Sequence, residues 1–107
     1  MWKIEPPTSG YYAVIFSSKK SDTLDGYKEM DEITMQLAQE QEGFLGYESC
    51  NNGASGIFIS YWKDMESINL WKENMTHIKA KSNAKRWYER YLSQICMVEH
   101  SHLFENK

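Results

Sequence analysis

The chain of 107 residues is long enough for one domain and leaves no room for a second hydrophobic core. Twelve Lys and Arg residues oppose fifteen Asp and Glu residues, and the net charge of −3 argues against a protein that binds nucleic-acid phosphates. A hydrophobic fraction of 41% and a charged fraction of 25% are typical of a folded globular chain. The composition therefore predicts one folded domain without a nucleic-acid partner.

The sequence contains no segment that predicts a membrane span or a secretion signal. The longest apolar run, Tyr11–Phe16, is far too short to cross a bilayer, and the first residues contain no apolar stretch. We therefore expect a cytoplasmic location and no membrane partner. Cys50 and Cys96 lack the spacing of a disulfide framework or a zinc site, and their apolar surroundings predict two buried, reduced thiols.

The first half of the chain predicts an arm, a strand and a helix. Residues 1–9 are expected to be extended because two prolines cannot join a sheet ladder, and Trp2 is expected to anchor this arm. The β-branched and aromatic run at residues 11–18 predicts a strand that is apolar on both faces. A helix should follow, capped by Asp22 or Thr23 and ended by Gly43. Its apolar stripe comprises Tyr27, Met30, Thr34, Leu37, Ala38 and Gln41.

The second half predicts a hairpin, a second helix and a last strand. Residues 44–51 and 57–62 are expected to be strands joined by a glycine-containing turn. Asp64 predicts the N-cap of the second helix. The helix is expected to break between Thr76 and Lys81 because the apolar stripe rotates there, and residues 92–100 should form the last strand. The two stripes are Ile68, Trp71, Met75 and Ile78, then Ala80, Ala84, Trp87, Tyr88 and Tyr91.

The order β-α-β-β-α-β predicts an α+β fold of the ferredoxin-like type, with a four-stranded antiparallel sheet and both helices on one face. We expect this domain over residues 10–104, with a C-terminal tail at residues 105–107. The strands are apolar on both faces, whereas the helices cover only one. A bare second face would be an unusually large apolar patch, so we expect a homodimer through the helix-free face.

Several stretches of the chain resemble the antibiotic biosynthesis monooxygenase family, especially its small single-domain bacterial members, over residues 10–100. They are the segments 41–49 (QEGFLGYES) and 60–63 (SYWK), and a block with Trp71, Lys72, His77, Arg86, Trp87, Tyr88 and Tyr91. The resemblance implies a dimeric α+β barrel, in which two ferredoxin-like sheets close face to face. It also implies one of two activities: oxygenation of quinols or polyphenols without metal or flavin, or oxidative breakdown of haem.

Cofactor-free oxygenation requires an apolar pocket for an electron-rich aromatic compound and dioxygen, and polar groups that take up a proton and stabilise the resulting anion. His77 is the candidate catalytic base, because the ordinary pKa of imidazole lies near neutrality. No cofactor and no metal are expected. The residues expected to line a small-molecule pocket between the broken helix and the sheet are Trp71, Met75, Trp87, Tyr88, Tyr91, Ser60 and Trp62.

Plainer roles for these residues stay open. Trp71 and Met75 at helical spacing also fit an ordinary core, the tyrosines fit hydrogen bonds to backbone groups, and His77 fits a cap on carbonyls at the helix break. His100 and His102 are expected on one face of the last strand, without a third ligand that would predict a metal site.

Three functions follow, in order of preference: a cofactor-independent monooxygenase, a non-catalytic small-molecule binder or sensor with the same pocket, and a haem-binding protein. The haem alternative is weakest, because the iron-ligating histidine of that branch falls at Lys81 in this chain. The first strand, residues 11–18, also lacks the asparagine of that branch.

Overall fold

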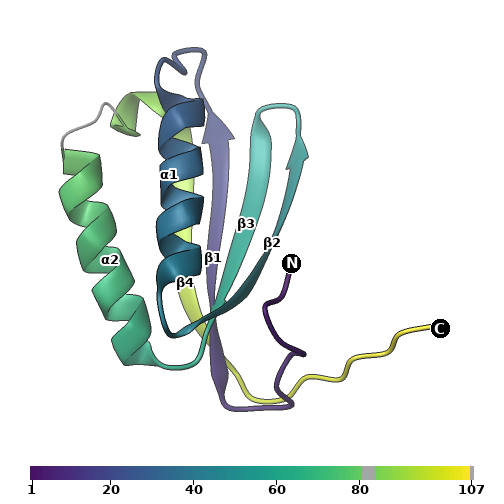
Figure 1. Ribbon diagram of the computed structural model, residues 1–107. Coiled ribbons are helices and arrows are strands. Elements are labelled where there is room, and N and C mark those ends of the chain that lie inside the picture. Colours follow the sequence, from purple (N-terminus) through teal and green to yellow (C-terminus); the bar gives the residue numbers. More distant parts are fainter. Residues whose placement is uncertain (81–83, 107) are drawn as a thin grey trace.

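A computed structural model describes residues 1–80 and 84–106, which form four antiparallel strands and two helices. The strands follow the order β2-β3-β1-β4 in one sheet, and both helices lie on the same face of it (Figure 1). The predicted α+β ferredoxin-like fold is confirmed. In chain order the elements are β1 (Tyr11–Lys20), α1 (Tyr27–Glu40), β2 (Phe44–Asn52), β3 (Ser55–Trp62), α2 (Met65–Ala80), a short 3-10 helix η1 (Ala84–Trp87) and β4 (Tyr88–Val98).

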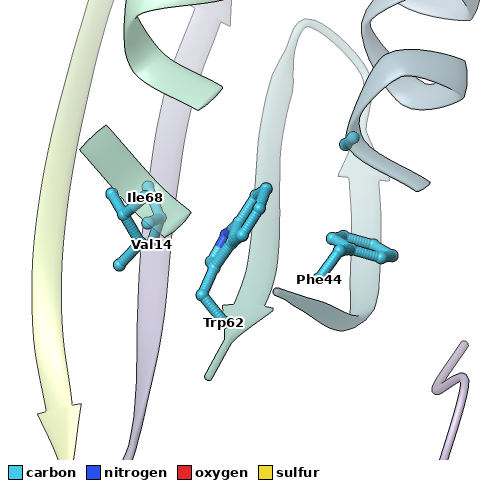
Figure 2. Packing of buried hydrophobic residues seen from close by; sticks show 5 residues of the cluster. Val14, Phe44, Trp62 and Ile68 are labelled. Atoms are coloured by element: carbon cyan, nitrogen blue, oxygen red, sulfur yellow. The ribbon is translucent and has the colours of Figure 1, made fainter. Parts of the chain in front are cut away.

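The hydrophobic core lies between the sheet and the two helices. Trp62, at the end of β3, is fully buried and lies between Phe44 on one side and Val14 and Ile68 on the other (Figure 2). The rings of Trp62 and Phe44 meet edge to face, with centroids 5.4 Å apart. Ala38 of α1 completes this cluster, so one indole joins the sheet to both helices.

The two helices begin in different ways. The Asp64 carboxylate accepts a hydrogen bond from the backbone N–H of Ser67 (2.8 Å), so the predicted N-cap of α2 is confirmed. The predicted cap of α1 by Asp22 or Thr23 is wrong, because α1 begins only after Gly26, which has φ +82° and provides no side-chain cap. The intervening loop is held instead by a long-range bond from the N–H of Ser21 to the carbonyl oxygen of Trp87 (2.7 Å).

Gly43 has a different role from the predicted helix stop. Helix α1 ends at Glu40 with Gln41 as its C-cap, and Gly43 has no positive φ. A Cβ atom at Gly43 would lie 1.9 Å from Oγ and 2.4 Å from Cβ of Ser67. Gly43 is therefore the residue that lets the first turn of α2 approach the start of β2.

The predicted second helical stripe is wrong. Helix α2 continues through Thr76 to Ala80, and Lys81 lies outside the described residues. Trp87 ends η1, whereas Tyr88 and Tyr91 lie in β4. Strand β4 also begins and ends earlier than the predicted span of residues 92–100, so His100 and His102 follow the strand rather than share one of its faces. Tyr88 and Tyr91 lie on the same face of β4 although they are three residues apart, because β4 shifts register against Lys19 and Lys20 of β1. This spacing of three resembles the spacing on one face of a helix.

The N-terminal arm covers one end of the helix-free face. Trp2 forms an isolated bridge with Gly46, and its ring stacks on Tyr61 at 4.1 Å and meets Tyr11 edge to face. The backbone N–H of Lys3 donates to the carbonyl oxygen of Leu45 (2.8 Å). Trp2 thus anchors the arm, and Tyr11 is buried beneath it.

The rest of the helix-free face is open in the single chain. Ile57 is 50% exposed and Leu92 is 40% exposed. Cys50 and Cys96 are exposed as well, so the prediction that both thiols are buried is wrong. Both lie on this face, where no helix covers them. Among the described helices, none is long and apolar enough to cross a membrane.

Candidate functional site

Three of the predicted pocket residues meet under α2. Ser60 and Trp62 are fully buried neighbours on the helix-facing side of β3, and Nε1 of Trp62 donates to Oγ of Ser60 at 2.8 Å. Trp71 of α2 packs against Trp62, with ring centroids 5.1 Å apart at an interplanar angle of 37°. Cross-strand pairing places Val14 beside Ser60 and Tyr12 beside Trp62. The result is an aromatic layer with one internally satisfied indole.

The indole of Trp71 is not satisfied. Its Nε1 is closed off from solvent, yet it has no hydrogen-bond acceptor among the described residues. A buried N–H without a partner costs about 1–3 kcal/mol, whereas the indole of Trp62 in the same layer has Ser60. An oxygen atom that reached Nε1 of Trp71 would recover this cost. The aromatic layer therefore contains one buried N–H donor, that of Trp71, that has no acceptor among the described residues.

The other predicted aromatic residues gather at the hairpin end of the sheet, the end at which the β2–β3 turn lies (Figure 1). Tyr91 stacks on Phe16 with centroids 5.3 Å apart, and Tyr88 meets both rings edge to face. Trp87 is buried; its Nε1 donates to the carbonyl oxygen of Asp25 (2.8 Å), and its ring meets Tyr27 edge to face. These rings lie on the same side of the sheet as Trp62, because Phe16 and Val14 share a face of β1.

Two phenols and a carboxyl group form the polar part of this end. Burial raises the pKa of Tyr88, and the neighbouring Tyr27 raises it further through its charge and a hydrogen bond between the two hydroxyls. Burial also raises the pKa of Tyr27, with a smaller contribution from Asp31. Desolvation raises the pKa of Asp31, opposed by the positive charge of Lys20. Both phenols are therefore protonated at neutral pH, and the carboxyl holds its proton to a higher pH than an ordinary aspartate.

The last two predicted residues lie apart in α2. Met75 is buried and lies four residues after Trp71, so it points to the same side of the helix. His77 is exposed, and α2 runs past it without a break. The structure thus brings together two groups, one around Trp71 and one around Tyr88, and leaves the imidazole at the surface.

Three residues of the group around Tyr88 were not predicted from the sequence as site residues. From the sequence, Tyr27 was expected only as part of an apolar stripe and Phe16 only as part of the first strand, and Asp31 was not named as a site residue. The period of the first helix was the only available signal, because it placed Tyr27 and Asp31 one turn apart on one face. Nothing in the sequence showed that this turn would meet Tyr88.

Two hollows on the surface are lined by other residues. One, of about 370 Å³, lies where α2 begins and is lined by Gly43, Lys63, Ser67 and Leu70 among others. The second, of about 430 Å³, lies on the helix-free face at the hairpin end of the sheet. Neither contains a predicted site residue, so a ligand between α2 and the sheet would need the side chains there to move apart.

The fold and this aromatic layer define a ferredoxin-like α+β protein of the antibiotic biosynthesis monooxygenase type, and comparison with known proteins confirms that resemblance. A model of the monooxygenase af470-like family matches residues 15–102, and the chain belongs to that family. The Bacillus subtilis (strain 168) protein YqjZ, itself uncharacterized, is 44% identical over 103 residues, which cover 94% of this chain and 88% of YqjZ.

Solved structures support the same fold. Two structures of SnoaB, a cofactor-independent oxygenase from Streptomyces nogalater, superimpose with TM-scores of 0.71 and 0.69 at 8% and 10% identity, covering 87% of this chain and 97% of SnoaB. A Nitrosomonas europaea protein that carries the name of the antibiotic biosynthesis monooxygenases superimposes with a TM-score of 0.65 at 13% identity, covering 88% of this chain and 94% of that one. At these identities the likeness concerns the fold alone.

Proposed function

We propose that the chain is a cofactor-independent monooxygenase for a small aromatic or quinol-like compound, which binds between α2 and the sheet. The observation that carries this proposal is the buried N–H of Trp71, whose ring packs on Trp62 and which has no acceptor in the part of the chain that the structure describes. A phenolate oxygen of the ligand supplies that acceptor. Donors that are already in place where negative charge develops stabilise the anion without further reorganisation.

The chemistry needs no external reductant. For a ring methylene activated by neighbouring hydroxyl groups, R₂CH₂ + O₂ gives R₂C=O + H₂O, so the substrate itself supplies the electrons. The protein must exclude water, hold the ring against Trp62 and Trp71, and stabilise the anion from which oxygen takes an electron. His77 is the proposed base. Because His77 is exposed on α2, it takes up the substrate proton through a bridging water at the edge of the site.

Oxygen uptake by metal-free protein tests this function, with anthrones and dihydroxynaphthalenes as probes. We expect substrate-dependent uptake, with water as the second product, so that added catalase returns no oxygen. Trp71→Phe keeps a ring but removes the N–H, and it should lower kcat by about 10²-fold. His77→Ala should abolish turnover, and unchanged turnover would remove His77 from the mechanism. No uptake with any probe would contradict the oxygenase.

A second candidate function is ligand binding without turnover. The exposed position of His77 favours it, because the imidazole then lies away from the donor at Trp71. In that case the same probes quench tryptophan fluorescence with saturation, and Trp71→Phe weakens binding, but no oxygen is consumed. A haemin titration that gives no shifted Soret band would exclude haem binding as the function.

We further propose that two copies pair through the helix-free face. Leu92 is 40% exposed there, and the partly exposed Ile15 and Ile59 pair with each other across β1 and β3 on the same face. Sedimentation of Leu92→Glu tests this: the variant should remain folded and become monomeric. Ile33→Glu is the matched control, because Ile33 is 44% exposed on α1, away from this face. Equal self-association of both variants would contradict the pairing.

A further inference from the structure

The helix-free face ends in a row of polar and cationic side chains at the hairpin end of the sheet. Strand pairing sets Asn52 opposite Ser55, Ser55 opposite Lys19, and Lys19 opposite Arg90, so the row crosses all four strands. We call these four residues the cationic row. The next row of the same face contains Cys50, Ile57, Ser17 and Leu92. An apolar surface therefore borders the cationic row.

A hollow of about 430 Å³ lies over these two rows, and its lining includes Ser17, Lys19, Asn52, Ser55, Ile57 and Arg90. Its volume is in the range of small-molecule sites. The hollow lies on the helix-free face of the sheet, whereas Trp71 and the proposed oxygenase site lie on the opposite face. The hollow is thus separate from that site.

The charges of this hollow are unbalanced. Lys19 and Arg90 are direct cross-strand partners, and like charges in such a position destabilise a sheet. Glu89 forms an ion pair with Lys19 (Nζ to Oε2, 3.2 Å), whereas Arg90 forms no ion pair among the described residues. Within the described residues, the Arg90 guanidinium therefore lies beside a second cation without a carboxylate partner.

From these observations we infer that the hollow binds a small organic anion, whose carboxylate or phosphate lies against Arg90 and whose apolar part lies on Ile57. The planar guanidinium presents two parallel N–H groups that match the oxygens of a carboxylate or phosphate. The hydroxyl groups of Ser17 and Ser55 and the amide of Asn52 are further donors within the same hollow. An aromatic carboxylate satisfies both the cation and the apolar wall. This inference does not depend on the oxygenase or on its site.

Cys50 provides a built-in reporter, because its exposed thiol also lines the hollow. In a Cys96→Ser background, the rate of labelling of Cys50 by uncharged N-ethylmaleimide is measured with benzoate, inorganic phosphate, or sodium chloride at equal ionic strength. Labelling should slow about tenfold when the anion is at ten times its Kd. Arg90→Gln should raise that Kd by about tenfold or more, since it removes a charged hydrogen-bond partner.

Two controls make the outcome decisive. Arg86→Gln removes the same charge from the exposed 3-10 helix η1 and should leave protection of Cys50 unchanged. Cys96, labelled in a Cys50→Ser background, lies on the same face outside the hollow and should not be protected. Protection by benzoate alone assigns aromatic carboxylates, and protection by both anions assigns oxyanions in general. Protection by neither, equal protection of both thiols, or protection that survives Arg90→Gln would overturn the inference.

The helix-free face also carries the proposed dimer contact, so the measurements are repeated below and above the concentration at which the chain self-associates. Protection of Cys50 that follows the anion concentration at both protein concentrations supports the site. Protection that follows protein concentration alone would reflect pairing of two copies and would overturn it. A chain without oxygenase activity leaves each of these outcomes unchanged.

Discussion

Replacement of Ser60 by alanine tests how the aromatic layer is stabilised. The Ser60 hydroxyl is the acceptor for Nε1 of Trp62, and both residues have 0% exposure. Ser60→Ala changes the volume little and leaves a second buried N–H unpaired, at a cost of about 1–3 kcal/mol. A loss of 2 kcal/mol lowers Tm by about 8 °C or more in a domain of this size.

Thermal and urea unfolding measure this loss, with Ser93→Ala on the exposed part of β4 as the matched control. The control should change stability by less than about 0.5 kcal/mol. A double-mutant cycle with Trp62→Phe separates the hydrogen bond from packing, because phenylalanine has no N–H to leave unpaired. Equal losses for Ser60→Ala and Ser93→Ala, or the same loss in the Trp62→Phe background, would refute the reasoning.

Three further predictions concern the parts of the fold that surround this layer. Gly46→Ala places a Cβ atom 2.7 Å from the Cα of Trp2, so the arm should detach, with a red shift of tryptophan emission and protease cleavage near Trp2 as the readouts. Gly43→Ala meets Ser67 and should lower the free energy of unfolding by about 1–3 kcal/mol, whereas adding Ser67→Gly should restore part of it. Hydrogen bonds from Ser67 lower the pKa of Asp64, so its stabilising charge is present above the ordinary pKa and is lost as pH falls below it. The stability difference from Asp64→Asn should therefore shrink in acid.

Local pattern was enough to predict the sheet and the start of α2. The strands alternate or carry β-branched and aromatic residues, and Asp64 satisfies a backbone N–H only three residues away. The start of α1 could not be predicted in this way. Asp22 and Thr23 are good capping residues, but Ser21 is held by the carbonyl oxygen of Trp87, a contact across 66 positions of the chain. No local signal contains such a contact.

The sequence indicated which types of residue gather at the candidate site, but it did not indicate how their side chains contact one another. The predicted aromatic residues of β3, α2 and β4 lie on the helix side of the sheet, yet the lack of an acceptor for the Trp71 N–H among the described residues depends on which groups the fold places nearby. The prediction of buried cysteines failed for a related reason. Cys50 and Cys96 lie in apolar strands, but a single chain provides helices for only one face of the sheet. Coverage of the other face would come from the second copy that we propose above.

The register shift at the start of β4 leads to a last prediction. Arg90 pairs with Lys19 and Tyr88 pairs with Lys20, so Glu89 is the extra residue of a bulge. Deletion of Glu89 should restore regular pairing and keep Tyr88 on the helix side, with only an exposed ion pair lost, which is worth less than about 1 kcal/mol. Deletion of Gln94 from the middle of the same strand should be far more damaging, because every residue on one side of it changes face. Thermal unfolding compares the stability of the two deletion variants. Near-ultraviolet circular dichroism of the tyrosine cluster reports whether Tyr88 keeps its aromatic neighbours. If deletion of Glu89 unfolds the chain as readily as deletion of Gln94, the bulge is part of what stabilises the sheet and the helical spacing of Tyr88 and Tyr91 has another cause.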